Sequence, residues 1–249
     1  MEPVILSMEV DDDNSWDSYY RLRIGSQVKY LVISPGTFDR DTLSLPLQSL
    51  PKLPTGEWTM AKISRDKATG DLRTGFSNHV LSGVRSQWHP ASVDCLELER
   101  SNQLTASAFE VITPRSIPAF DASSPATMIA KIARFEWEVP RIEQETIAYQ
   151  LLEGSGLAPR FLAHIHENGR IMGFLLEKLK GRHASIQDLM QEDGIKLLDF
   201  ENFQENASPE LMQKELENLS GQLVEEIGFT KESPFSVRSI SSIPGSMFV

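Results

Sequence analysis

The sequence predicts an α+β fold in which short strands of an antiparallel sheet are combined with few helices. Runs of β-branched and aromatic residues recur between residues 19 and 112, and again near residues 128, 161 and 171. Apolar residues recur at helical spacing twice, near residue 145 and near residue 216. Glycine, proline and asparagine stand between these segments and mark the turns that join them.

The first 56 residues are predicted to form a β-hairpin followed by an extended connector. Tyr19–Ile24 and Gln27–Ile33 are rich in strand-forming residues and flank Gly25-Ser26, a pattern typical of a tight turn. Proline and glycine then interrupt the stretch from Pro35 to Pro54, which has no hydrophobic period. A domain boundary is therefore expected after residue 56.

Three runs beyond Glu57 predict strands of one antiparallel sheet. They are Trp58–Ser64, Val93–Leu98 and Ala106–Ile112, and each is bounded by Gly, Asn, Ser or Pro. Short strands separated by turn residues pair most simply in the antiparallel sense.

A strand and a helix follow. Met128–Ala133 is predicted to be a strand. Pro140 stands where the first turn of a helix tolerates a missing N–H, and Gly154 and Gly156 are expected to end this helix in the left-handed conformation. Four residues of the helix recur at its period: Ile142, Glu145, Tyr149 and Leu152.

A hairpin comes next. Phe161–His166 and Ile171–Leu176 flank Asn168-Gly169, a pair typical of a two-residue turn in which both φ angles are positive. His164 and His166 alternate onto one face of the first strand, as a metal-binding pair would. No cysteine or carboxylate joins them at ligand spacing, so a hydrogen-bonded surface pair is predicted.

The order of strand, helix and hairpin, with Lys131 in the strand and Glu145 in the helix, resembles the N-lobe of the protein-kinase-like superfamily. The similarity is to the aminoglycoside phosphotransferase and choline kinase relatives, especially fungal proteins of the protein-kinase-like domain class. It extends from about Glu57 to Glu226 and implies a fold of two lobes with ATP in the cleft between them. Residues 57–180 would form the N-lobe, an antiparallel sheet with an αC-type helix.

The resemblance implies roles for these two residues. In phosphoryl transfer a strand lysine contacts the α- and β-phosphates of ATP, and a helix glutamate holds the lysine. Lys131 and Glu145 match those positions, with Glu143 as the alternative partner because the phase of the helix is uncertain. The competing interpretation is an ordinary strand lysine and a solvated helix face.

The resemblance also implies an adenine contact at the end of the hairpin. The sequence FLLEKLKGR is similar to the segment that links the two lobes, whose backbone N–H and C=O groups can bind the adenine edge. The matching residues are Glu177, Lys178 and Leu179. Any strand that runs into an extended loop would look similar.

A magnesium ligand is implied further along the chain. Ile195–Leu198 is predicted to be a buried strand, and Asp199 at its end matches the magnesium-binding aspartate of kinases. Phe200 and Glu201 replace the usual Phe-Gly, a departure that small-molecule kinases tolerate. The alternative is an aspartate that caps a turn.

The catalytic loop of the family is missing from the sequence. Between Gly181 and Gly194 stand His183 and Asp188, but not the His-x-Asp-x-x-x-x-Asn spacing that carries the catalytic base and the second metal ligand. No catalytic residue is therefore assigned, and residues 181–227 are expected to form a truncated, mostly helical C-lobe.

The C-terminal part is predicted to contain one amphipathic helix. Ser208 can cap it and Pro209 can occupy its first position. Its apolar face is formed by Met212, Leu216, Leu219, Leu223 and Ile227. Core packing is the expected role of this helix at 209–227, and a protein partner is the alternative. Residues 228–249 are predicted to be a mobile tail.

Composition limits the partners and the compartment. The 249 residues carry a formal net charge of −11, which disfavours nucleic acid and anionic membranes. The single cysteine excludes a disulfide framework, and neither a signal peptide nor a membrane span is visible, so a cytoplasmic protein is expected.

Two functions follow from these expectations. The favoured one is a kinase-like protein that retains elements of an ATP and Mg²⁺ site but lacks the catalytic loop, as an inactive pseudokinase or a truncated small-molecule kinase. The alternative is an active ATP-dependent phosphotransferase acting on a small-molecule hydroxyl. Loss of a positioned base alone costs about two to four orders of magnitude in rate, which favours the inactive protein.

Overall fold

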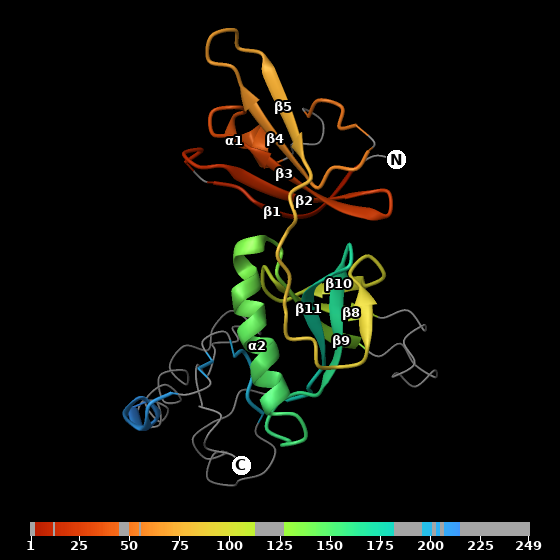
Figure 1. Ribbon diagram of the computed structural model, residues 1–249, viewed down its shortest axis with the longest axis vertical. Helices are drawn as coiled ribbons and strands as arrows, with labels where there is room; N and C mark the ends of the chain where they lie inside the picture. The colour runs from red at the N-terminus through yellow and green to blue at the C-terminus, as the bar shows by residue number, and fades with distance from the viewer. Residues whose placement is uncertain are drawn as a thin grey trace. The chain divides into compact units, whose positions relative to one another are not determined.

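The computed structural model describes residues 3–11, 13–44, 50–54, 56–112, 127–181, 196–200, 203–204 and 207–214. The chain divides into two compact units, Met1–Ser82 and Gly83–Val249. Each unit contains one mixed β-sheet, so the α+β class is confirmed (Figure 1).

The first unit is a five-stranded sheet of order β1-β2-β3-β4-β5 with one short helix. All neighbouring strands are antiparallel except β3 and β4, which are parallel. The strands are β1 (Val4–Glu9), β2 (Ser18–Ile24), β3 (Gln27–Ile33), β4 (Met60–Arg65) and β5 (Leu72–Ser77), and the helix is α1 (Arg40–Ser44).

The predicted hairpin at the start of the chain is confirmed. Strands β2 and β3 pair from Ile24↔Gln27 outward, and Gly25 between them has a φ of 65°, a conformation that glycine adopts without strain. The hydroxyl of Tyr20 in β2 donates a hydrogen bond to the carbonyl oxygen of Leu43 in α1, at an O···O distance of 2.7 Å. The helix is thereby fastened to the sheet, within a segment that the sequence predicted to be an extended connector.

The predicted boundary after residue 56 differs from the division of the structure, which lies between Ser82 and Gly83. The reason is the parallel pairing of β3 with β4, in the register Tyr30↔Met60 to Ile33↔Ile63. Because β4 completes the sheet that the hairpin begins, the residues up to β5 belong to the first unit.

The second unit is a six-stranded sheet of order β6-β10-β11-β9-β8-β7 with one long helix. Its strands pair antiparallel except β6 and β10, so the prediction of a wholly antiparallel sheet is wrong in both units. The elements are β6 (Ser92–Asp94), β7 (Glu99–Gln103), β8 (Ala108–Ile112), β9 (Thr127–Ile132), the 3-10 turn η2 (Glu136–Glu138), α2 (Val139–Leu151), β10 (Phe161–Glu167) and β11 (Arg170–Glu177).

The helix and the second hairpin form as predicted. Pro140 lies in the first turn of α2, and Gly154 and Gly156 beyond its end have φ angles of 74° and 73°. In the β10–β11 turn, Asn168 and Gly169 have φ angles of 48° and 85°. Both signs match the predicted turn type.

Helix α2 covers one face of the second sheet (Figure 1). Its buried side chains include Val139, Ile142, Ala148 and Tyr149, which join the core that the sheet provides. The same face also buries a carboxylate, that of Glu145. A buried carboxylate on a packing face requires a charged partner, which is expected on the sheet that α2 covers.

The prediction of a strand at Ile195–Leu198 is wrong for its described residues. Residues 196–200 have no regular secondary structure, and residue 195 lies outside the described part of the chain. Leu197 is buried, and its N–H donates to the carbonyl of Leu157 in the loop after α2, at 2.7 Å. This stretch is therefore anchored to a loop instead of to a sheet.

Much of the predicted C-lobe at 181–227 cannot be compared, because residues 182–195 and 215–249 lie outside the described residues. His183, Asp188, the first residue of the predicted strand (Ile195), most of the amphipathic helix and the tail fall there. The beginning of that helix is confirmed at 209–214, where Ser208 Oγ accepts the N–H of Leu211 at 3.3 Å. The prediction of a mostly helical C-lobe is not confirmed, because 209–214 is the only helical segment among the described residues from 181 onward.

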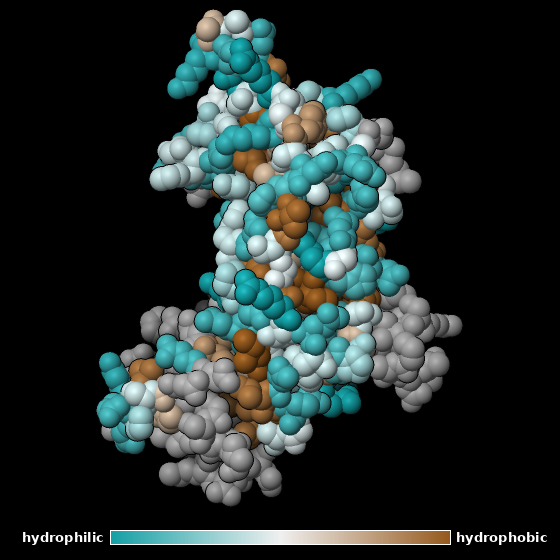
Figure 2. Space-filling view, viewed as in Figure 1, coloured by the Kyte–Doolittle hydropathy of each residue, from teal (hydrophilic) through white to brown (hydrophobic). Residues whose placement is uncertain are grey.

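On the face that Figure 2 shows, hydrophilic residues predominate among the described residues, and hydrophobic residues show in groups between them. The most exposed large apolar side chains include Trp16 and Val80, at 75% and 88%. Among the described residues, no helix combines the length and the apolar character needed to cross a bilayer.

Candidate functional site

A buried lysine contacts two carboxylates in the second unit. Lys131 Nζ lies 2.7 Å from Glu145 Oε1 and 2.7 Å from Asp199 Oδ1. The side chains of the lysine and the glutamate are 11% and 1% exposed, and that of the aspartate is 17% exposed. We call these three residues the lysine–carboxylate cluster. It unites residues that the sequence assigned separately to a strand, a helix and a metal position.

The sheet fixes the position of Lys131. In β9 the lysine lies opposite Phe174 of β11 on one side and Ala108 of β8 on the other. A residue with a paired strand on each side has little freedom, and its side chain leaves the sheet on the face fixed by the pleat. The lysine therefore projects from a rigid position.

Helix α2 selects Glu145 over the alternative partner Glu143. The Glu143 carboxylate accepts the backbone N–H groups of Arg85 at 2.5 Å and Ser86 at 3.0 Å, and also the Ser86 hydroxyl. Glu145 contacts Lys131 instead. The two glutamates are about 200° apart around a helix, so they face different neighbours.

Asp199 is held in an unusual backbone conformation. Its φ is 66°, in the left-handed region that residues other than glycine adopt infrequently, although Asp and Asn do so more readily. Such conformations persist where the surrounding structure imposes them, and they are concentrated at functional sites. The conformation here accompanies a carboxylate that reaches the lysine.

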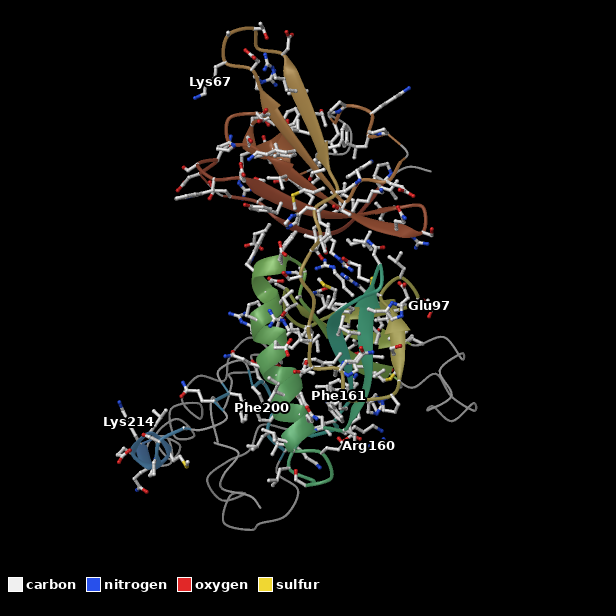
Figure 3. The ribbon with its side chains drawn as sticks, viewed as in Figure 1. Lys67, Glu97, Arg160, Phe161, Phe200 and Lys214 are labelled. Atoms are coloured by element: carbon white, nitrogen blue, oxygen red, sulfur yellow. The ribbon has the colours of Figure 1, made fainter. Side chains whose placement is uncertain are left out.

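Tyr149 supports Asp199 from the helix. Its hydroxyl hydrogen-bonds the backbone of Asp199, and its ring lies 5.0 Å from that of Phe200, edge to face at 87°. Figure 3 shows Phe200 beside the C-terminal half of α2. The sequence analysis used Tyr149 only to define the helical period. Its spacing of four residues from Glu145, which places both on one helix face, was the available signal.

Electrostatics keep the lysine charged. Burial alone would lower the pKa of Lys131, but the negative charges of Glu145 and Asp199 outweigh burial and raise the pKa above its ordinary value. Burial, reinforced by the same two carboxylates, raises the pKa of Tyr149 well above its usual range. Lys131 therefore stays protonated at every physiological pH.

The predicted adenine contacts do not join the cluster through their side chains. The Glu177 carboxylate accepts the backbone N–H of Arg160 at 3.0 Å and its Nε at 2.9 Å. Lys178 Nζ lies 2.8 Å from Glu110 Oε1 of β8, and Leu179 is half-buried just beyond β11. The predicted role concerns backbone groups of 177–179, which no described contact tests.

The cluster has the oxygen donors that a magnesium–nucleotide complex uses. Magnesium is commonly held by one or two carboxylates together with phosphate oxygens, without an all-protein cage. Asp199 and Glu145 supply two carboxylates next to the lysine. In the described part of the chain, no three His, Cys, Asp or Glu residues are grouped as metal ligands. Asp199 would hold the ion together with oxygens from the nucleotide and from water.

The predicted surface pair of histidines is wrong for one member. His164 is fully buried, and its Nε2 accepts the N–H of His89 at 3.2 Å. The strand register shifts between Ile165 and His166, and His166 Nδ1 lies 3.6 Å from an Asp94 carboxylate oxygen. Simple alternation of side chains therefore fails at this point.

Burial makes His164 sensitive to acid. Burial, with a smaller contribution from His89, lowers the pKa of His164 from 6.5 to about 4. Between pH 6.5 and pH 4, His164 is protonated in the unfolded chain but stays neutral in the folded chain. The unfolding free energy therefore falls as the pH falls through this range. The unfolding free energy should lose on the order of 2 kcal/mol over this window through His164.

Urea denaturation at pH 7.5 and pH 4.5 measures this loss. His164→Gln keeps an acceptor near the Nε2 position but cannot be protonated, so its stability should change less between the two pH values. Equal pH dependence in wild type and His164→Gln would contradict the assignment.

No protein-family model matches this chain, and no curated protein sequence matches it. The geometry of the lysine–carboxylate cluster is thus the basis on which a function can be assigned.

Proposed function

We propose that this chain is a kinase-like protein that binds ATP with Mg²⁺ at the lysine–carboxylate cluster and transfers no phosphoryl group. It would act as a pseudokinase or be a truncated small-molecule kinase. The observation that carries the proposal is the position of Lys131 Nζ, 2.7 Å from both Glu145 and Asp199. Phosphoryl-transfer folds use such a lysine and glutamate for the nucleotide phosphates and an aspartate for the metal.

The arrangement of the second unit supports a kinase-like N-lobe. The strand with the lysine, the helix with the glutamate and the β10–β11 hairpin follow one another in the order of the resemblance. They also pack together, because β9 pairs with β11 and α2 buries one face against the same core. An ordinary ion pair between a lysine and a glutamate would not require a strand, a helix and a hairpin that pack against one core.

The β7–β8 turn supports a place for the phosphates. Ala108 pairs with Lys131, and the Ser107 carbonyl accepts the N–H of Ile132 at 2.9 Å. Residues 104–107 therefore lie at the end of β9 that carries the lysine. Kinases cover the nucleotide phosphates with a loop at this kind of position, but this turn lacks their glycine-rich sequence.

The absence of a catalytic-loop sequence supports an inactive protein. The whole sequence contains no His-x-Asp-x-x-x-x-Asn, so neither the base nor the second metal ligand is supplied in the usual way. A bound nucleotide would then be retained without efficient transfer. The lysine–carboxylate cluster supports binding without transfer, because it offers an ammonium group for the phosphates and carboxylates for the magnesium ion without a base for the acceptor hydroxyl.

Binding of ATP to the full chain tests the proposal. Protein is titrated with ATP in Mg²⁺ and in EDTA, and the Tm is followed. At about 100 times Kd the bound nucleotide should add about 2.7 kcal/mol of stability. Asp199→Asn keeps a residue that tolerates positive φ but removes the charge, and Lys131→Arg keeps the charge but changes its geometry. Each should weaken binding about tenfold or more.

Asp94→Asn is the matched control, because it removes a carboxylate from β6 outside the cluster and should leave ATP binding unchanged. The proposal is overturned if the wild type shows no Mg²⁺-dependent binding, or if both cluster variants bind as tightly as the wild type. Phosphate release by the wild type that Asp199→Asn abolishes would overturn inactivity and establish an ATP-dependent phosphotransferase.

A further inference from the structure

Residues 83–91 cross from the sheet to helix α2 and back, and we call them the strap. The strap begins against β11, where the Val84 N–H donates to the carbonyl of Ile171 at 2.9 Å. A Cβ at Gly83 would lie 3.0 Å from the same carbonyl oxygen, a tight contact that would push the strap and β11 apart by a few tenths of an ångström. In Figure 1 the strap runs, in yellow-orange, alongside α2.

The strap next contacts α2 through Glu143. Its carboxylate accepts two backbone N–H groups, from Arg85 at 2.5 Å and Ser86 at 3.0 Å, together with the Ser86 hydroxyl. Hydrogen bonds to an ionised carboxylate are shorter and about twice as strong as those between neutral groups. Three donors on one half-buried carboxylate therefore fix the strap to this point of the helix.

A second contact lies one helical turn further along. Trp88 Nε1 donates to the backbone carbonyl of Thr146 at 3.2 Å, and the indole ring lies 4.6 Å from the ring of Phe161 in β10. The tryptophan thus touches the helix with its polar atom and the sheet with its apolar face.

The strap ends on β10. The His89 N–H donates to His164 Nε2 at 3.2 Å, and the His164 N–H donates to the carbonyl of Ala91 at 2.9 Å. Sheet, helix and sheet are therefore joined in succession within nine residues. The two helix contacts, at Glu143 and Thr146, lie on either side of Glu145.

We infer that the strap sets the rotation of α2 about its axis and its position along that axis, relative to the sheet. Glu143 is then a positioning residue for the Lys131–Glu145 contact. A rotation of α2 by one residue, about 100°, would carry Glu145 away from the lysine. The strap opposes this because both of its helix contacts would break. This inference rests on the proposed function only for its consequence, which is the formation of the nucleotide-binding lysine site.

Chemical labelling of Lys131 tests the inference without nucleotide. The full chain is treated with an acylating reagent at pH 8, and the acylation of Lys131 relative to the exposed Lys178 is measured by mass spectrometry. In the wild type the buried, paired amine should react slowly. Glu143→Gln loses the charge that holds three donors and should raise the rate at Lys131 about tenfold. Trp88→Phe loses the indole N–H and part of the ring but keeps the three Glu143 hydrogen bonds, so it should raise the rate less.

Two controls separate positioning from general destabilisation. Gln144→Ala changes an exposed neighbour on the same helix and should leave the labelling rate within about twofold of the wild type. Val111→Ala weakens the core in β8 without touching the strap, and it is compared at equal loss of Tm. If Val111→Ala accelerates labelling of Lys131 as much as Glu143→Gln does, the strap has only a structural role and the inference is overturned.

An ATP titration of the same variants relates the strap to the site. Glu143→Gln should raise the Kd for ATP with Mg²⁺ about tenfold, and Gln144→Ala should not change it. The labelling experiment contains no ATP. Failure of the wild type to bind ATP therefore overturns the proposed function alone, whereas unchanged labelling in Glu143→Gln overturns the inference alone.

Discussion

Lys131→Met should be among the most destabilising single substitutions in the second unit, costing about 3 to 5 kcal/mol of unfolding free energy. The change removes the only charge that the described structure places between Glu145 and Asp199, both of which lie within 2.7 Å of the lysine amine. Two carboxylates in a nearly dry site then repel each other. The loss should be larger at pH 8 than at pH 5, where one carboxyl of the pair can hold a proton.

Calorimetry of the full chain at the two pH values measures this effect. The double variant Lys131→Met/Glu145→Leu removes one of the repelling carboxylates and should recover part of the lost stability, because a buried pair replaced by apolar groups is tolerated better than a broken one. A loss below about 1 kcal/mol, the value of an exposed ion pair, would show that the cluster is solvated.

Gly173→Ala should destabilise the second unit by about 3 kcal/mol or prevent its folding. Gly173 lies opposite Ile132 in the β9–β11 ladder, and an added Cβ would lie 2.9 Å from the Ile132 Cα and closer still to the Lys131 carbonyl oxygen. Backbone atoms in the middle of a sheet cannot move aside as a flexible side chain can. One strand must shift, and Lys131 would shift with it.

Gly181→Ala is the matched control for this substitution. Among the described residues, no atom lies within 4 Å of a Cβ added at Gly181, so its effect should stay within about 0.5 kcal/mol. Urea denaturation of both variants and of the wild type gives the comparison. Equal midpoints for Gly173→Ala and the wild type would mean that β9 and β11 are not held as closely as the structure has them.

Local signals in the sequence were sufficient for the local elements. Asn168-Gly169 sets a turn through its own φ preferences, and Pro140 with Gly154 limits a helix from within. The contact between Lys131 and Glu145 followed because a strand and the helix after it have few ways to pack. These parts depend on neighbours in sequence.

Features that depend on distant pairing were not predictable. The parallel pairing of β3 with β4 joins residues about 30 apart, and no local pattern encodes its register. The predicted boundary after residue 56 failed for this reason. The phase of α2, which decides between Glu143 and Glu145, is set by the strap, whose hydrogen bonds join residues about 58 apart. His164 was misplaced because a bulge changes which side chains face inward.

The left-handed backbone at Asp199 limits which residues can replace it. Glycine would adopt the same φ of 66° without the penalty of about 1 kcal/mol that a side chain incurs there, but it would deprive the buried Lys131 amine of one of its two carboxylates. Most longer side chains would meet the opposite difficulty, because they would have to adopt a conformation that Asp and Asn enter more readily. Few substitutions at this position can therefore satisfy the backbone and the lysine together.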